Sequence, residues 1–134
     1  MVFSRADRMG NMYELKVEGH FAAAHNLRGY QGVCEALHGH NWKVEVVVRA
    51  EGLNNIGLAI DFKDLKAALT EIMDKLDHTY LNDIEHFKVE NPSSENIARY
   101  IFHKLSESLG SSTVWVYKVT AWESERACAS YFEN

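Results

Sequence analysis

Residues 34–48 read Cys-Glu-Ala-Leu-His-Gly-His-Asn-Trp-Lys-Val-Glu-Val-Val-Val, and this stretch decides the fold. Successive side chains of a β-strand point to opposite faces, so residues two apart share a face. One such face is apolar after a His-x-His pair, and its members are His38, His40, Trp42, Val44, Val46 and Val48. The pattern predicts a strand from His38 to about Ala50 that buries one face. Two imidazoles at its start could close on one metal ion.

A second strand is predicted from Met12 to Phe21, because apolar and polar residues alternate there. The apolar positions are Tyr13, Leu15, Val17 and Phe21. Continued extension of this strand would place Ala23 and His25 on the same inward face. Residues 26–32 contain turn-forming residues and predict a loop that leads to the opening stretch.

Two amphipathic helices are predicted in the middle of the chain. Asp61 is the expected N-cap of the first, whose apolar positions are Phe62, Leu65, Leu69, Ile72, Met73 and Leu76. The second follows the capping and proline residues of 91–95, and its apolar positions are Ile97, Ile101, Phe102 and Leu105. Gly110 is expected to end it. Residues 79–90 are expected to be a mostly polar connection.

The C-terminal part predicts a hairpin, with strands at 113–122 and 127–132 and a tight turn at 123–126. One face of the first strand is expected to hold Trp115, Tyr117, Val119 and Ala121. Glu123 has the same parity, and a carboxylate on an inward face is costly unless it has a partner. It would suit a ligand with two parallel N–H donors, although a solvated hairpin acid fits equally well. Cys128 is expected at a core strand position.

These elements predict a single α+β domain spanning residues 1–134, with residues 1–11 as a segment expected to be disordered. Four antiparallel strands form the sheet and two helices cover one face of it. The open edges of such a sheet invite pairing with another chain, so a symmetric homo-oligomer is expected.

Composition excludes several classes of function. The formal net charge is −5 and no basic run is interleaved with aromatic residues, so no nucleic-acid partner is expected. No apolar run approaches the ~18 residues of a membrane span, and no signal-peptide core is present. Two cysteines, Cys34 and Cys128, do not make a disulfide framework. We expect a cytoplasmic protein with a small-molecule ligand.

The His-x-His pair and His25 form the candidate metal centre. Strands of a hairpin lie ~5 Å apart, which brings His25, His38 and His40 within joint reach of one ion. Three neutral imidazoles make a common open zinc site with a fourth position for water or substrate. The alternative is that these are satisfied core or loop histidines.

Cys34 and the Asp77-His78 pair are candidates for proton transfer. Cys34 could be a fourth metal ligand, a base or nucleophile whose thiolate forms near a cation, or a plain buried side chain. An imidazole transfers protons near neutral pH, and the carboxylate of Asp77 could hold that of His78. His78 could equally serve only as a favourable charge at the end of its helix.

Taken together, these residues resemble the 6-pyruvoyl-tetrahydropterin synthase and 6-carboxy-tetrahydropterin synthase family. The matching motifs occur in the family's order and cover nearly the whole chain after Met12. They are Phe21-Ala22-Ala23-Ala24-His25, Cys34-x-x-x-His38-Gly39-His40, Ile60-Asp61-Phe62, Leu76-Asp77-His78-x-x-Leu81-Asn82, Asn91-Pro92-Ser93-Ser94-Glu95-Asn96 and Trp122-Glu123. Their combination is specific, whereas any one of them would be a weak signal.

The resemblance implies roles for these residues. The implied zinc ligands are His25, His38 and His40. The implied proton-transfer residues are Cys34, as general base, with Asp77 and His78. The implied pterin contacts are Glu123, at the edge of the pterin, with Ser94 and Glu95 near its ring. It also implies the tunnelling fold, in which trimers close a β-barrel, two trimers stack into a hexamer, and active sites lie between subunits.

The implied substrate is 7,8-dihydroneopterin triphosphate. The short spacing between Cys34 and His38 resembles the bacterial 6-carboxy-5,6,7,8-tetrahydropterin synthases of the queuosine pathway, lyases that release acetaldehyde and triphosphate. A 6-pyruvoyl-tetrahydropterin synthase activity is an alternative, although the longer spacing of the animal enzymes is absent.

Glu35 keeps a further alternative open. A family branch that makes 6-hydroxymethyl-7,8-dihydropterin for folate carries a glutamate at this place, so a folate-directed or dual activity is the runner-up. Glu35 could also be a solvated loop acid. The alternative from another class is a zinc-stabilised binding protein without turnover, in which Cys34 completes a closed site with the three histidines.

Overall fold

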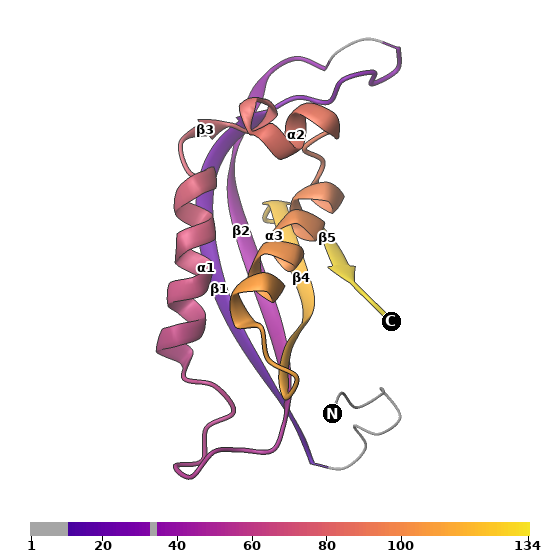
Figure 1. Ribbon diagram of the computed structural model, residues 1–134. Coiled ribbons are helices and arrows are strands. Elements are labelled where there is room, and N and C mark those ends of the chain that lie inside the picture. Colours follow the sequence, from indigo (N-terminus) through magenta and orange to yellow (C-terminus); the bar gives the residue numbers. More distant parts are fainter. Residues whose placement is uncertain (1–10, 33–34) are drawn as a thin grey trace.

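The computed structural model describes residues 11–32 and 35–134 (Figure 1). Residues 1–10, most of the segment expected to be disordered, and Cys34 lie outside the described residues. The elements, in chain order, are β1 (Met12–His25), β2 (His38–Glu51), α1 (Phe62–Leu76), β3 (Thr79–Tyr80), the 3-10 helix η2 (Leu81–Asp83), α2 (Glu85–Val89), α3 (Ser94–Leu109), β4 (Val114–Ser124) and β5 (Ala127–Phe132).

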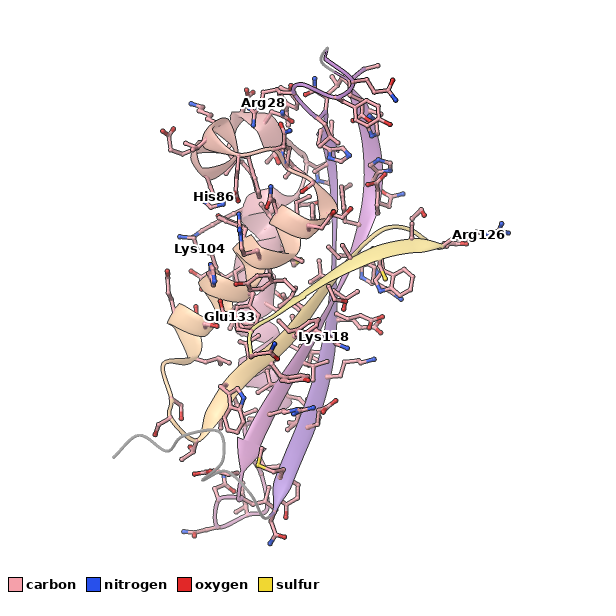
Figure 2. All side chains as sticks on the ribbon, turned by 90° about the vertical axis from the view of Figure 1, so that its right-hand side faces the viewer. Arg28, His86, Lys104, Lys118, Arg126 and Glu133 are labelled. Atoms are coloured by element: carbon pink, nitrogen blue, oxygen red, sulfur yellow. The ribbon has the colours of Figure 1, made fainter. Side chains whose placement is uncertain are left out.

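The strands form one sheet in the order β3-β1-β2-β4-β5. β3 runs parallel to β1, and the other neighbouring pairs are antiparallel. The long helices α1 and α3 cover one face of the sheet, and the other face carries no helix in the described residues (Figures 1 and 2). The prediction of an α+β fold with helices on one face is therefore confirmed.

The predicted strand number was wrong, because the sheet has five strands rather than four. The additional strand, β3, has only two residues, which is too short for an alternating pattern to be visible. It lies within residues 79–90, where the sequence predicted only a polar connection. The same stretch contains η2 and α2, and α2 packs through the fully buried Phe87.

The core lies between the sheet and the two long helices. The predicted inward face of β2 is confirmed, since Trp42, Val44, Val46 and Val48 are all fully buried. On β1, Gly19 lets α1 come close: a Cβ there would lie 3.1 Å from side-chain carbons of both Leu69 and Met73. α1 therefore packs directly on the β1 backbone at this position.

Both long helices have the predicted caps. The carboxylate of Asp61 accepts a hydrogen bond of 2.8 Å from the Lys63 N–H at the start of α1. Ser93 caps α3 in the same way, and Gly110 ends α3 with a φ of +50°. The prediction was wrong for Phe62, which is 49% exposed because it lies at the first position of α1, beyond the sheet contact.

A β-bulge in β4 contradicts part of the predicted hairpin. Val47 pairs with Lys118 and Val48 with Val116, so Tyr117 is an extra residue in β4. Val116, rather than Trp115 or Tyr117, therefore joins Val119 and Ala121 in the core. The Tyr117 ring instead lies on the other face, 3.4 Å from the Arg49 guanidinium carbon.

Two further details of the C-terminal hairpin differ from the prediction. Glu123 lies inside β4 rather than in the turn, because β4 continues to Ser124. Cys128 is exposed rather than in the core, since it lies on β5, an edge strand that pairs only with β4. None of the described helices is both long and apolar enough to span a bilayer.

Candidate metal centre

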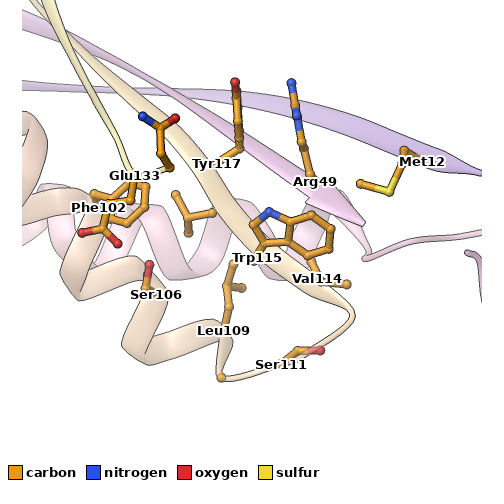
Figure 3. Close-up of a pocket in the computed structure, with 13 residues that line it drawn as sticks. Met12, Arg49, Phe102, Ser106, Leu109, Ser111, Val114, Trp115, Tyr117 and Glu133 are labelled. Atoms are coloured by element: carbon orange, nitrogen blue, oxygen red, sulfur yellow. The ribbon is translucent and has the colours of Figure 1, made fainter. Parts of the chain in front are cut away.

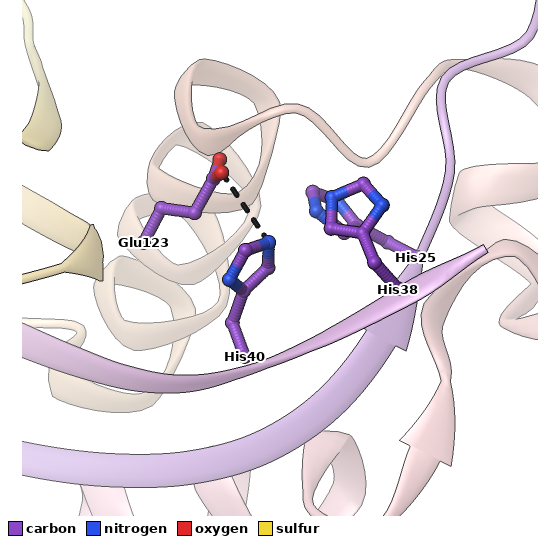
Figure 4. A group of neighbouring side chains, drawn as sticks. All are labelled: His25, His38, His40 and Glu123. Atoms are coloured by element: carbon purple, nitrogen blue, oxygen red, sulfur yellow. Dashed lines mark ion pairs between the residues drawn. The ribbon is translucent and has the colours of Figure 1, made fainter. Parts of the chain in front are cut away.

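The register of the β1–β2 hairpin brings three histidines together. His25, at the end of β1, is the direct partner of His38 at the start of β2, and Ala23 is the partner of His40. All three side chains therefore lie at one end of one sheet face (Figure 4). The imidazole ring centroids are 4.7 to 5.1 Å apart.

Backbone carbonyl groups orient two of the three imidazoles. The Nδ1 of His25 lies 2.8 Å from the carbonyl oxygen of Pro92, and the Nδ1 of His38 lies 2.8 Å from that of Ala36. A carbonyl oxygen only accepts hydrogen bonds, so each Nδ1 carries a proton and donates it. In the neutral form of each ring, this tautomer leaves Nε2 with a lone pair for a metal ion.

Two ring nitrogens of the cluster lack a hydrogen-bond partner among the described residues. The Nε2 atoms of His25 and His40 are both buried without a hydrogen-bond partner, and His25 as a whole is only 2% exposed. Such orphaned atoms are costly in an apolar interior, and a bound cation would satisfy them together.

The spacing of the candidate ligand atoms also fits a metal ion. One atom from each of His25, His38, His40 and Glu123 can be chosen so that all lie within 4.8 Å of one another. Ligand atoms around a tetrahedral zinc ion are roughly 3.3 Å apart. Small side-chain rotations would close the site, so these residues could hold a metal ion.

Glu123 joins the cluster from β4. Its Oε1 lies 3.3 Å from the Nε2 of His40, which is an ion-pair contact without hydrogen-bond geometry. Its Oε2 accepts a hydrogen bond of 3.2 Å from the hydroxyl of Ser94, in the first turn of α3. The carboxylate is thus held beside the histidines, and its side chain remains 37% exposed to a ligand.

The surroundings of His40 favour its neutral imidazole. Burial lowers the pKa of His40, and the neighbouring His25 and His38 lower it further, while Glu123 partly opposes the shift. A neutral imidazole is the form that binds metal ions.

The Asp77-His78 pair lies at the outer edge of β1, apart from the cluster. The Asp77 carboxylate accepts a hydrogen bond of 2.7 Å from the Ala22 N–H and lies 2.8 Å from the Nδ1 of His78. The Ala22 N–H, followed by the bond to His78, lowers the pKa of Asp77 despite some desolvation. The His78 side chain is 83% exposed, so its other ring nitrogen is accessible to a partner molecule.

The other predicted site residues differ in how close they lie to the cluster. Ser94 contacts Glu123, but Glu95 is exposed in the first turn of α3. Glu35 lies close to the cluster, with its Oε1 3.8 Å from the Nδ1 of His38. The position of Cys34 lies outside the described residues. The contacts of the Pro92 and Ala36 carbonyl groups with the histidines cannot be predicted from the sequence, because every residue type has a backbone carbonyl group.

A separate cavity of about 570 Å³ lies toward the opposite end of the sheet (Figure 3). Its lining includes Arg49, Trp115, Tyr117 and Glu133, and none of the candidate site residues. The Arg49 guanidinium is already engaged, since it stacks on Tyr117 and pairs with Glu14. The histidine cluster, with its orphaned ring nitrogens, is therefore the better candidate for chemistry.

Comparison with known proteins decides the family. Residues 14–134 match the family described as 6-pyruvoyl tetrahydropterin synthase. The chain belongs to this family. Family members act on pterin substrates, which agrees with the resemblance noted from the sequence motifs.

Individual relatives of the family carry different activity names. A 6-carboxy-5,6,7,8-tetrahydropterin synthase of Synechocystis is 36% identical over 126 residues, covering 90% of this chain and 94% of that protein. A dihydroneopterin monophosphate aldolase of Pyrococcus furiosus is 36% identical over 103 residues, covering 77% of this chain and 82% of that protein. The solved Caenorhabditis elegans 6-pyruvoyl tetrahydropterin synthase is 27% identical, with a TM-score of 0.80 over 92% of this chain and 97% of that one.

Proposed function

We propose that this protein is a zinc-dependent 6-carboxy-5,6,7,8-tetrahydropterin synthase. It would convert 7,8-dihydroneopterin triphosphate and water into 6-carboxy-5,6,7,8-tetrahydropterin, acetaldehyde and triphosphate in the cytoplasm, as a step toward queuosine. The observation that carries the proposal is the convergence of His25, His38 and His40 at one sheet end, with two orphaned Nε2 atoms. The similarity to the Synechocystis enzyme over nearly the whole chain supports this choice of reaction.

The three histidines would hold the zinc ion. When bound, zinc would polarise the oxygen atoms of the substrate side chain and lower the cost of removing neighbouring protons. Pro92 and Ala36 would keep the His25 and His38 rings in the required tautomer through their carbonyl groups.

Glu123 would anchor the pterin. A carboxylate matches the two parallel N–H donors at one edge of a pterin ring. The Ser94 hydroxyl fixes one oxygen of this carboxylate and thus its orientation, and Glu95 would lie nearby, close to the ring. Glu123 could instead be a fourth metal ligand, since it lies beside His40.

Cys34 and His78 would move protons. Cys34 would act as the general base, since a thiolate is stabilised near a cation. The Asp77 carboxylate would hold the His78 imidazole by Nδ1 and leave its Nε2 free to exchange a proton with the substrate.

The active form would be a homo-oligomer built from trimers, as a hexamer. Within the described residues, β5 is an open sheet edge, and β3 covers β1 only at Ala23 and Ala24. Pairing of β1 with β5 of another copy would satisfy both edges and close a barrel. It would also bring the exposed His78 next to the substrate-binding site of a neighbouring copy. A monomer in light scattering of a dilute solution would contradict this.

Product identification tests the proposed reaction. The zinc-loaded protein is incubated with 7,8-dihydroneopterin triphosphate, and the pterin and aldehyde are identified by mass spectrometry. We expect acetaldehyde and 6-carboxy-5,6,7,8-tetrahydropterin. A 6-pyruvoyl-tetrahydropterin product would favour that alternative reaction, and unchanged substrate would refute the enzyme assignment for this pterin.

The substitution Cys34→Ala separates a base from a structural ligand. For a base, zinc content stays unchanged while turnover is lost. In the non-enzyme alternative, where Cys34 and the three histidines close the site, zinc and fold are lost together. Glu123→Gln tests the role of Glu123. If Glu123 binds the pterin, the variant should have a raised KM and retain zinc. If Glu123 is a metal ligand, the variant should bind zinc more weakly.

A second candidate function rests on Glu35. Its carboxylate lies 3.8 Å from His38, where it could serve as a base for forming 6-hydroxymethyl-7,8-dihydropterin, alone or beside the first activity. A relative named as an aldolase of dihydroneopterin monophosphate supports a carbon–carbon cleavage of this type. The product assay distinguishes the two, since this reaction would release a glycolaldehyde-type fragment. Glu35→Gln should abolish that product selectively.

A further inference from the structure

The side chain of Asn82 forms hydrogen bonds with both backbone groups of Asn26, the residue that follows His25. The Asn82 Oδ1 accepts a hydrogen bond of 3.1 Å from the Asn26 N–H, and the Asn82 Nδ2 donates one of 2.8 Å to the Asn26 carbonyl oxygen. Asn82 is buried at 7% exposure. This two-bond clip fixes Asn26 to η2 just beyond the end of β1.

The side chain of Asn26 bridges two separate segments. Its Oδ1 accepts a hydrogen bond of 2.6 Å from the hydroxyl of Tyr80, two residues after His78. Its Nδ2 donates one of 3.0 Å to the carbonyl oxygen of Glu35. All four polar groups of Asn26 therefore have partners: Asn82 for both backbone groups, and Tyr80 and Glu35 for the side chain.

Glu35 is fixed to the same stretch by two more bonds. Its N–H donates a hydrogen bond of 2.9 Å to the carbonyl oxygen of Leu27. Its Oε1 accepts a hydrogen bond of 3.2 Å from the Leu27 N–H. The backbone and the carboxylate of Glu35 are thus held through Asn26 and Leu27. A change in Asn26 would reach the carboxylate near His38 through this connection.

We propose that Asn26 is a positioning residue that couples the placement of Glu35 to that of the segment carrying Asp77, His78 and Tyr80. The chemical basis is the primary amide, which donates on one side and accepts on the other in a fixed plane. The coupling itself needs only the hydrogen bonds; its effect on turnover rests on the proposed function. The alternative is a set of independent hydrogen bonds, in which a change at Tyr80 would leave Glu35 unaffected.

Two near-isosteric substitutions each cut one side of the bridge. Asn26→Asp keeps an oxygen for the Tyr80 hydroxyl but removes the donor to Glu35. Tyr80→Phe removes the hydroxyl and leaves the bond between Asn26 and Glu35 in place. Because Tyr80 does not touch Glu35 in any of the described hydrogen bonds, an effect of Tyr80→Phe on Glu35 must pass through Asn26.

Hydrogen exchange at the Glu35 amide, on the zinc-loaded protein, tests the coupling without substrate. We expect roughly fivefold faster exchange in Asn26→Asp, the change that corresponds to one ordinary hydrogen bond. We expect a smaller acceleration, of about twofold, in Tyr80→Phe, and a non-additive double variant. Unchanged exchange in Tyr80→Phe would overturn the proposal even if Asn26→Asp does not fold. Strict additivity in a folded double variant would overturn it as well.

Activity gives the second readout. With zinc content unchanged, both variants should lower kcat by at least about tenfold with little change in KM, because misplaced reacting groups slow the chemical step. Tyr13→Phe and Asn54→Asp are matched controls at the other end of the sheet and should behave as wild type. If wild type lacks activity but the exchange coupling is present, the proposed function fails and the coupling stands. A raised KM with kcat unchanged would refute the positioning role.

Discussion

The Nδ1 of His25 donates to the carbonyl oxygen of Pro92 across 2.8 Å, although 67 residues separate the two in the chain. This bond ties the end of β1 to the entrance of α3. It explains why a histidine that is almost fully buried can keep a fixed tautomer. It also couples the candidate metal ligand to the helix that carries Ser94.

Replacing the buried ligand should remove the metal. His25→Ala is expected to reduce zinc affinity by at least about tenfold, because second-shell changes alone cost that much. Zinc content is measured after gel filtration. His20→Ala is the matched control, since His20 is exposed on the opposite face of β1. Full zinc content in His25→Ala would contradict the assignment of this ligand.

Zinc should stabilise the folded protein. A ligand that binds only the folded state at a hundred times its Kd adds about 2.7 kcal/mol to the free energy of unfolding. Chelator should therefore lower the melting temperature, and zinc should restore it. Both effects should vanish in His25→Ala. A wild-type melting temperature that does not respond to chelator would argue against a metal-linked fold.

Asp77 should make the protein sensitive to acid. Its pKa is lowered below the ordinary value of 3.8 in the folded state, so its stabilising contribution is present above that value and is lost as the pH falls further. Asp77→Asn should melt at a lower temperature than wild type at pH 7, and the difference should shrink below about pH 4. Asp74→Asn, an exposed acid on α1, is the control. A constant difference across this range would refute the role of the Asp77 charge.

The close approach of α1 at Gly19 gives a prediction on stability. Gly19→Val should destabilise the protein by roughly 1–3 kcal/mol, because its side chain would press on Leu69 and Met73. Gly39→Val is a matched control, since the nearest atom to a Cβ there is 3.9 Å away. Urea denaturation of both variants measures the difference. Equal stability of the two would show that α1 shifts freely.

The sequence predicted the elements that depend on short repeating patterns. The β1 and β2 faces, the Asp61 and Ser93 caps and the helix stop at Gly110 are all readable from residues close in the chain. The placement of the three histidines at one end of one hairpin follows from that same alternation, once the two strands are paired.

Features set by long-range packing could not be predicted. The bulge at Tyr117 reverses the alternation of β4 without any glycine or proline to signal it. The exposure of Cys128 depends on β5 being an edge strand, which its own residues do not indicate. The contacts of Asn26 with Tyr80 and Glu35 join three segments, so no local motif contains them.

The hairpin register has a consequence for how proteins built on this hairpin could diversify. The spacing of the three histidines is set by the paired strands, whereas Glu35 is carried by the connection between them. Residues 26–37 can therefore change in length and composition without altering the distance between His25 and His38. New acids and bases could therefore arise on this connection while the three histidines keep their spacing.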